Sequence, residues 1–134
     1  MIRALAFLAS ICAPSLALAA DSTWLWCHGS ADRGGTRTHF AASILEHRAP
    51  SGDARELSVM LVYGDHASRG TVAKNSKLTT KNIASAHVVF TGTGKLDNAM
   101  TTFALDGDLD TSFGDSAKPT TVAFTATLTC ETLD

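Results

Sequence analysis

The stretch Thr121-Val-Ala-Phe-Thr-Ala-Thr-Leu-Thr-Cys130 decides the fold class, because its apolar and polar residues alternate with period two. Successive side chains of a β-strand point to opposite faces, so this pattern predicts a strand with one buried and one exposed face. Threonines dominate the exposed face, which is typical of a half-buried strand in an antiparallel sheet. The predicted buried face holds Val122, Phe124, Ala126, Leu128 and Cys130.

The same alternation recurs along the chain and predicts strands in residues 24–27, 38–46, 56–63, 83–91 and 98–113. In segment 56–63 both faces carry apolar side chains, which predicts a central strand buried on both sides. A further edge strand is expected around residues 70–73. Residues 41–48 are also compatible with one or two helical turns. Turn-forming residues predict connections at 32–35, 49–53, 92–95 and 114–115.

Short strands with frequent turns and no long helical period predict an all-β domain. We expect a small antiparallel β-sandwich or barrel of about 6–8 strands. The chain has 134 residues, of which 45% are hydrophobic and 18% are charged. This length fits one domain, and the apolar fraction excludes intrinsic disorder. The single β-domain is expected to span residues 21–134.

The first 20 residues have the pattern of a secretory signal peptide. Arg3 provides the positive start, an apolar run follows, and small residues around Ala17–Ala20 resemble a cleavage site. The apolar run is too short to cross a bilayer, and Pro14 interrupts it. We therefore expect residues 1–20 to be removed by a bacterial export system. The mature protein would be periplasmic or secreted, without a membrane span.

The cysteines become a pair once the signal peptide is removed. Cys12 is lost with it, and Cys27 and Cys130 remain at the two ends of the mature chain. In an oxidising compartment such a pair usually forms a disulfide bond. A bond between Cys27 and Cys130 requires the first and last strands to be neighbours, with Cα atoms within about 7 Å.

Charge is distributed unevenly along the chain, although the total is only −2. Residues 33–95 contain nine Lys and Arg against four Asp and Glu, whereas residues 96–134 contain one Lys against seven Asp and Glu. The total excludes a generally basic nucleic-acid-binding protein. If the fold keeps these two segments apart in space, the protein has a basic and an acidic side. If the strand order mixes them, the charge asymmetry disappears.

Asp106, Asp108 and Asp110 alternate along a predicted strand, so their carboxylates are expected on one face. Carboxylate oxygens are suitable ligands for Ca²⁺, which makes this strip a weak candidate metal site. The spacing does not match a helix–loop–helix calcium loop, because Thr111 occupies the position of the turn glycine. The alternatives to a metal site are that this strip is a solvated strand face or a recognition surface for a cationic partner. No other cofactor is expected.

Trp24 and Trp26 also share a face of a predicted strand, next to Cys27. They are expected either to pack in the core or to form an exposed aromatic anchor, since Trp is enriched in binding hot spots. The sequence contains no nucleophile elbow, Walker loop or Cys-x-x-Cys motif, and we therefore expect no enzymatic activity.

Together these features favour an exported, non-enzymatic binding domain. The most economical hypothesis is a protein-binding inhibitor, or an immunity-type protein that neutralises a toxin or a hydrolase. Its expected contacts with a protein partner are Trp24, Trp26, Asp106, Asp108 and Asp110. The alternatives are a small-ligand or calcium/metal-binding carrier and a structural subunit of a surface assembly. The sequence favours no particular oligomeric state.

Overall fold

The computed structural model describes residues 22–48 and 55–133, and this part of the chain forms eight strands. The predicted signal peptide and the predicted turn at 49–53 lie outside the described residues. The strands are β1 (Ser22–Arg33), β2 (Thr36–Arg48), β3 (Arg55–Tyr63), β4 (His66–Val72), β5 (Lys77–Asn82), β6 (Val88–Leu96), β7 (Thr102–Asp110) and β8 (Thr121–Leu133).

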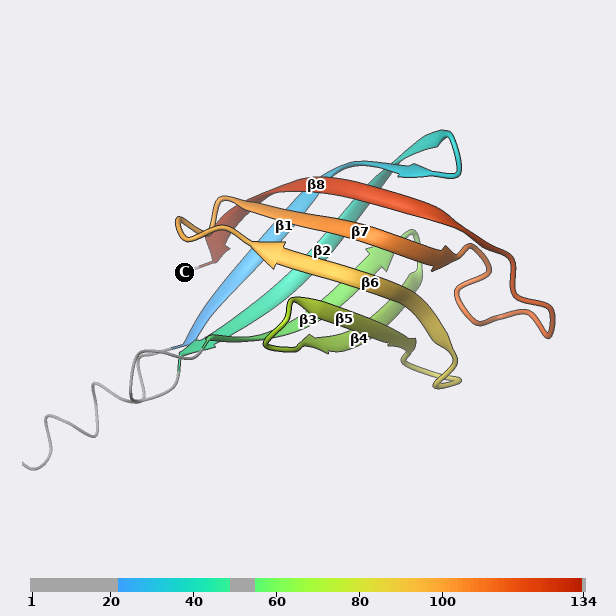
Figure 1. Ribbon diagram of the computed structural model, residues 1–134, viewed down its shortest axis with the longest axis horizontal. Helices are drawn as coiled ribbons and strands as arrows, with labels where there is room; N and C mark the ends of the chain where they lie inside the picture. The colour runs from blue at the N-terminus through green and yellow to red at the C-terminus, as the bar shows by residue number, and fades with distance from the viewer. Residues whose placement is uncertain (1–21, 49–54, 134) are drawn as a thin grey trace, which may run out of the picture.

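The strands form a closed antiparallel barrel in sequential order, in which each strand pairs with the next and β8 returns to pair with β1 (Figure 1). The all-β prediction is confirmed, and of the two predicted architectures the barrel is the correct one. The expected edge strand at residues 70–73 is part of β4, which pairs on both sides with β3 and β5. It is therefore not an edge strand, because closure removes the free edges of a sheet.

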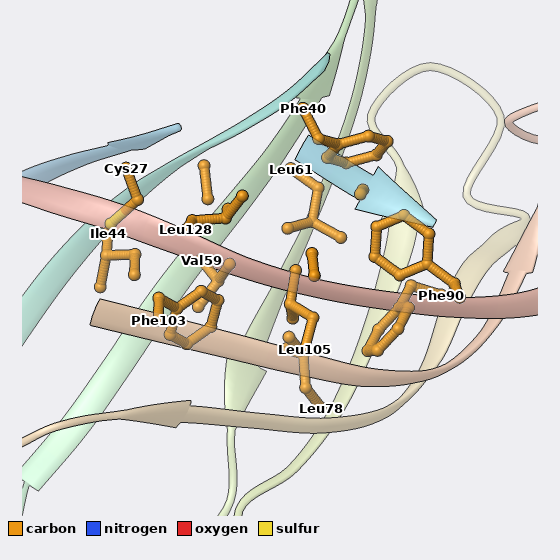
Figure 2. Close-up of a cluster of buried hydrophobic side chains, with 14 of the residues drawn as sticks. Cys27, Phe40, Ile44, Val59, Leu61, Leu78, Phe90, Phe103, Leu105 and Leu128 are labelled. Carbon is orange, nitrogen blue, oxygen red and sulfur yellow. The ribbon is translucent and has the colours of Figure 1, made fainter. Parts of the chain in front are cut away.

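Side chains fill the barrel interior. Figure 2 shows inward-pointing residues from strands around the barrel packed against one another, with Phe103 near one end and Phe40 and Phe90 near the other. Five phenylalanines are fully buried, and burial of such large apolar surfaces is the main favourable contribution to folding. These phenylalanines are Phe40, Phe90, Phe103, Phe113 and Phe124.

The strongest alternating segments form strands as predicted. In β8 the side chains of Phe124, Ala126, Leu128 and Cys130 are buried, while the intervening threonines are exposed. Segments 38–46 and 56–63 lie within β2 and β3, whereas segment 98–113 is a strand only over Thr102–Asp110, which is β7. The outward residues of β3 are only half-buried. The prediction that this strand is buried on both faces is therefore wrong. The wall of a barrel has one inner and one outer face, and the outer face of β3 meets solvent.

Three further local predictions are wrong. Residues 41–48 are extended in β2, because pairing with β1 and β3 overrides the helix-forming tendency of this Ala- and Leu-containing segment. Residues 83–87 form a turn before β6, and Ile83 is 52% exposed. The expected connection at 92–95 lies inside β6. β5 is not predicted from the sequence, because its polar residues leave little apolar alternation.

The disulfide bond joins the first strand to the last. Cys27 and Cys130 are direct partners in the β1–β8 register, with a Cα–Cα distance of 4.0 Å, and their sulfur atoms are bonded at 2.06 Å. Both side chains point into the barrel core. The predicted disulfide is therefore present, and it fastens the pairing that closes the barrel. A bond of this kind indicates an oxidising compartment, as expected for an exported protein.

An aromatic stack closes the barrel end that carries the β7–β8 connection. The rings of Phe40 and Tyr63 are stacked at 5.5 Å, those of Tyr63 and Phe113 at 5.8 Å, and those of His66 and Phe113 at 5.4 Å. The Arg33 guanidinium lies 4.5 Å from the centre of the Tyr63 ring, which adds a cation–π contact. Aromatic side chains thus fill this end of the barrel.

The β6–β7 turn predicts a specific loss of stability in acid. The Asp97 carboxylate accepts hydrogen bonds from the Thr101 hydroxyl and from the backbone N–H groups of Thr101 and Thr102. These bonds, above all the one from the Thr101 hydroxyl, lower the pKa of Asp97 from 3.8 to about 2. Because the folded-state pKa lies below the unfolded one, the stabilisation is fully present above about pH 4 and is lost as the pH falls to 2.

We expect unfolding experiments between pH 5 and 2 to show a smaller loss of stability in Asp97→Asn than in the wild type. Asp106→Asn is the matched control, because this carboxylate is exposed and accepts no hydrogen bond within the described residues. The control should follow the wild-type curve. Parallel pH curves for Asp97→Asn and the wild type would contradict the role of the Asp97 carboxylate.

Candidate functional site

Both tryptophans lie on the outer surface of the barrel. Leu25 and Cys27 point into the core, so the alternation of β1 directs Trp24 and Trp26 outward. Trp24 is 52% exposed and Trp26 is half-buried. Of the two placements considered from the sequence, core packing does not apply. The structure instead exposes the two largest side chains of the protein on one strand.

Neighbouring strands extend this aromatic pair into a patch. Trp24 is the direct partner of Leu133 on β8 and of Leu45 on β2, so all three side chains share the outer face. Leu133 is also 52% exposed, and Leu45 is half-buried. We call Trp24, Trp26, Leu45 and Leu133 the outer aromatic patch. Leu45 and Leu133 are not predictable from the sequence pattern, because only the register of β1 with its two neighbours brings them beside Trp24.

The patch has an acidic and polar border. Glu131 on β8 and Ser43 on β2 are the direct partners of Trp26. Glu131 is exposed, and its carboxylate lies 3.9 Å from the Nε2 atom of His28, the next outward residue of β1. The adjacent disulfide fixes the position of β1 against β8. The exposed apolar side chains are therefore held on a braced sheet rather than on a loop.

Asp106 and Asp108 also point outward and are exposed on β7. Their partners on β6 and β8 are Thr93 and Thr125 for Asp106, and Thr91 and Ala123 for Asp108. No hydrogen bond or ion pair of either carboxylate is found in the described part of the chain. The two residues form an exposed acidic strip, as the alternation predicted, and their charges are free to interact with a partner.

Asp110 has a different role. It is only 5% exposed, and its carboxylate accepts hydrogen bonds from the N–H and hydroxyl of Ser112 and from the N–H of Gly114. Burial raises the pKa of Asp110, but these hydrogen bonds outweigh it and hold the pKa below its ordinary value. Asp110 thus shapes the start of the β7–β8 connection. The period-two pattern placed it with Asp106 and Asp108, but the chain turns back over it.

The three aspartates do not come together as metal ligands. Among residues 22–48 and 55–133, no group of three or more His, Cys, Asp or Glu side chains is arranged to hold a metal ion. A calcium site at Asp106, Asp108 and Asp110 has no geometric support in this arrangement.

The outer aromatic patch and the acidic strip are separate surfaces. Asp32 on β1 lies level with Asp106, because both are partners of Thr125 on β8. Six residues separate Trp26 from Asp32 along β1, which corresponds to about 20 Å at roughly 3.3 Å per residue. An interface of ordinary size covers about 800 Å² on each partner, a disc roughly 30 Å across. One partner is therefore able to reach both surfaces.

The sequential strand order also keeps the charges apart. The outer faces of β4, β5 and β6 carry the exposed cations Arg69, Lys77, Lys81 and Lys95. The outer faces of β7 and β8 carry the exposed carboxylates Asp106, Asp108 and Glu131. The charge asymmetry of the sequence thus becomes a basic and an acidic sector of the barrel wall. Such fields steer charged partners toward one side of a protein.

Within the described residues there is no helix with the length and apolar character needed to cross a membrane. Comparisons with protein-family models, curated proteins and solved structures give no match to this chain.

Proposed function

We propose that this chain is an exported, non-enzymatic protein-binding domain that uses the outer aromatic patch as its central contact. The proposal is carried by the exposed side chains of Trp24 and Leu133, which lie beside the half-buried Trp26 on a sheet held by the disulfide bond. Exposed apolar clusters on folded proteins mark interaction sites, and Trp is enriched among the residues that dominate binding energy. The rigid sheet adds affinity because little ordering is needed on association.

The surroundings of the patch define the partner's chemistry. Glu131 borders the patch, and Asp106 and Asp108 lie within reach of the same interface. The complementary surface is an apolar pocket with a basic rim, which accepts the tryptophans at its centre and the carboxylates at its edge. Rim charges of this kind mainly increase the association rate. An inhibitor or immunity-type protein directed against a cationic toxin or hydrolase fits this description.

Replacing Trp24 by alanine is expected to weaken partner binding at least about 30-fold, which corresponds to the roughly 2 kcal/mol of a hot-spot residue. The fold should persist, because half of the Trp24 side chain is already exposed. Ile83→Ala is the matched control: Ile83 has the same 52% exposure but lies in the β5–β6 turn. This variant should bind as the wild type does.

The experiment uses the immobilised mature chain and periplasmic or secreted extract from the source organism. A captured protein counts as the partner only if wild type and Ile83→Ala retain it and Trp24→Ala does not. The purified pair is then titrated by difference fluorescence, since the protein's only two tryptophans both lie in the patch. Equal affinity of Trp24→Ala and wild type, or unchanged tryptophan emission in the complex, would refute the proposal. Asp106→Asn with Asp108→Asn should slow association at low salt.

A further inference from the structure

The barrel end opposite the aromatic stack is hollowed. A hollow of about 680 Å³ opens between the start of β3, the β4–β5 turn and the end of β6. A second hollow of about 460 Å³ adjoins it and shares Arg55, Val72, Ala73 and Lys74 as lining residues. These volumes fall in the range of small-molecule sites in proteins. The protein-binding role proposed above does not use this region.

The inner wall of the larger hollow is apolar. Leu57 and Leu96 contribute buried side chains, and Val72 contributes a half-buried one. Deeper in the barrel the interior is packed, with Leu78 and Phe103 fully buried. A ligand in this hollow therefore lies across the barrel end, with its apolar part against these side chains rather than inside the barrel.

Arg55 lines both hollows, and its hydrogen bonds hold the guanidinium in place. Its Nε donates to the buried Glu46 carboxylate at 2.5 Å, and its Nη1 and Nη2 donate to the carbonyl oxygens of Leu96 and Asp97 at 3.1 and 3.2 Å. Glu46 also accepts from Arg48 at 3.4 Å. A guanidinium has five N–H groups, so two N–H groups of Arg55 remain available in a pre-oriented position.

The rim of the hollow is cationic. Lys74 in the β4–β5 turn and Lys95 on β6 line it, and both side chains are exposed. Across residues 22–48 and 55–133, neither lysine forms an ion pair with a carboxylate. Together with Arg48 and Arg55, they outnumber the carboxylates of Glu46, Glu56 and Asp97 at this end. The positive charge that remains favours an anion placed between the two lysines.

We propose that this hollow binds an amphiphile with a single carboxylate headgroup, such as a medium-chain fatty acid. The headgroup lies between Lys74 and Lys95, within reach of the remaining Arg55 N–H groups. The hydrocarbon chain lies along Leu57, Val72 and Leu96. A fixed guanidinium beside two lysines suits a carboxylate, and the apolar wall removes the chain from water.

Isothermal titration with dodecanoate tests this site. We expect one dodecanoate to bind per protein, and neutral dodecanol to bind at least 10-fold more weakly. The double variant Lys74→Gln with Lys95→Gln should lower dodecanoate affinity at least 10-fold without loss of the fold, because both lysines are exposed. The matched control, Arg69→Gln with Lys81→Gln, removes the same charge from paired outward residues of β4 and β5. It should change affinity less than 2-fold.

Trp24→Ala separates this site from the outer aromatic patch, because Trp24 on β1 is not among the residues that line either hollow. Its dodecanoate affinity should equal that of the wild type. Equal binding of dodecanol and dodecanoate would overturn the headgroup assignment. An unchanged affinity in the Lys74 and Lys95 double variant, or a loss in Trp24→Ala, would place the ligand elsewhere and overturn the proposed site.

Discussion

Removing the disulfide by Cys27→Ala together with Cys130→Ala is expected to lower the free energy of unfolding by about 4 kcal/mol. The bond joins residues 103 positions apart, and restricting an unfolded chain with a loop of about 100 residues contributes roughly 4–5 kcal/mol in the chain-entropy treatment. It also lies within the β1–β8 pairing that closes the barrel. The variant loses the covalent bond between β1 and β8 and keeps the backbone hydrogen bonds between these two strands.

Urea unfolding of wild type and double variant measures this effect. The urea dependence of the free energy should become steeper in the variant, because an uncrosslinked chain exposes more surface when unfolded. Wild type treated with reductant should match the variant. Thr129→Ala, next to Cys130 on the exposed face, is the control and should change stability by less than about 0.5 kcal/mol. A loss below about 1 kcal/mol on removing the disulfide would show that the β1–β8 hydrogen bonds alone secure closure.

The pairing of β1 with β8 also shows how far the sequence could predict the fold. Alternation in β2, β3, β7 and β8 is strong because each strand has one face in a packed interior and one in solvent. The predicted cysteine pair required the first and last strands to be neighbours, which agrees with a closed barrel. The choice of barrel over sandwich nevertheless depends on pairing between residues about 100 positions apart. Local patterns carry no direct signal for such pairing.

The local errors have equally definite causes. The alternating pattern of segment 83–91 begins with Ile83, whose side chain the β5–β6 turn leaves in solvent. Gly92 and Gly94 resemble turn residues, yet they lie inside β6. There the backbone of β7 approaches Gly92 closely, and the side chains of other strands approach Gly94. Lys77–Asn82 has too few apolar residues to reveal β5. In each case contacts with other strands decide the outcome, and the local composition does not contain them.

The candidate site was predictable in part. Leu25 and Cys27 occupy alternate positions of β1 and mark its inner face. Trp24 and Trp26 occupy the other positions and therefore point outward. The addition of Leu45 and Leu133 depends on the register with two other strands. Asp110 continues the phase of Asp106 and Asp108, but the turn after β7 buries it. The hollow beside Lys74 and Lys95 combines three strands and one turn, and no single segment indicates it.

Gly92→Ala and Gly107→Ala are each expected to lower the free energy of unfolding by about 3 kcal/mol, toward the upper range for overpacked sites. The two glycines are direct partners in the β6–β7 register. A Cβ on Gly92 would overlap the carbonyl oxygen of Asp106 and lie 2.7 Å from the Cα of Gly107. A Cβ on Gly107 would overlap the carbonyl oxygen of Thr91 and lie 2.6 Å from the Cα of Gly92. The obstacles are backbone atoms, which cannot move without separating the strands.

The sign of this effect is informative. Where an alanine fits, replacing glycine stabilises a protein by about 0.4–1 kcal/mol, because the unfolded chain loses freedom. Neither Gly92 nor Gly107 has a positive φ, so the backbone conformation itself permits alanine at both positions. Destabilisation would therefore report the lack of space between β6 and β7. A stabilising Gly92→Ala would show that the two strands lie further apart and would contradict the close approach.

Gly64→Ala separates the steric effect from the conformational one. Gly64 has a φ of +59°, and nothing lies within 4 Å of the Cβ that alanine would add. Its replacement should cost only about 1–2 kcal/mol, the penalty of a left-handed conformation for an L-residue. Thermal or urea unfolding should rank Gly92→Ala and Gly107→Ala below Gly64→Ala in stability. That order is expected only if the close contact between β6 and β7, rather than backbone conformation, requires glycine at these two positions. Gly107 lies between Asp106 and Asp108, so this contact also fixes the strand that carries the acidic strip.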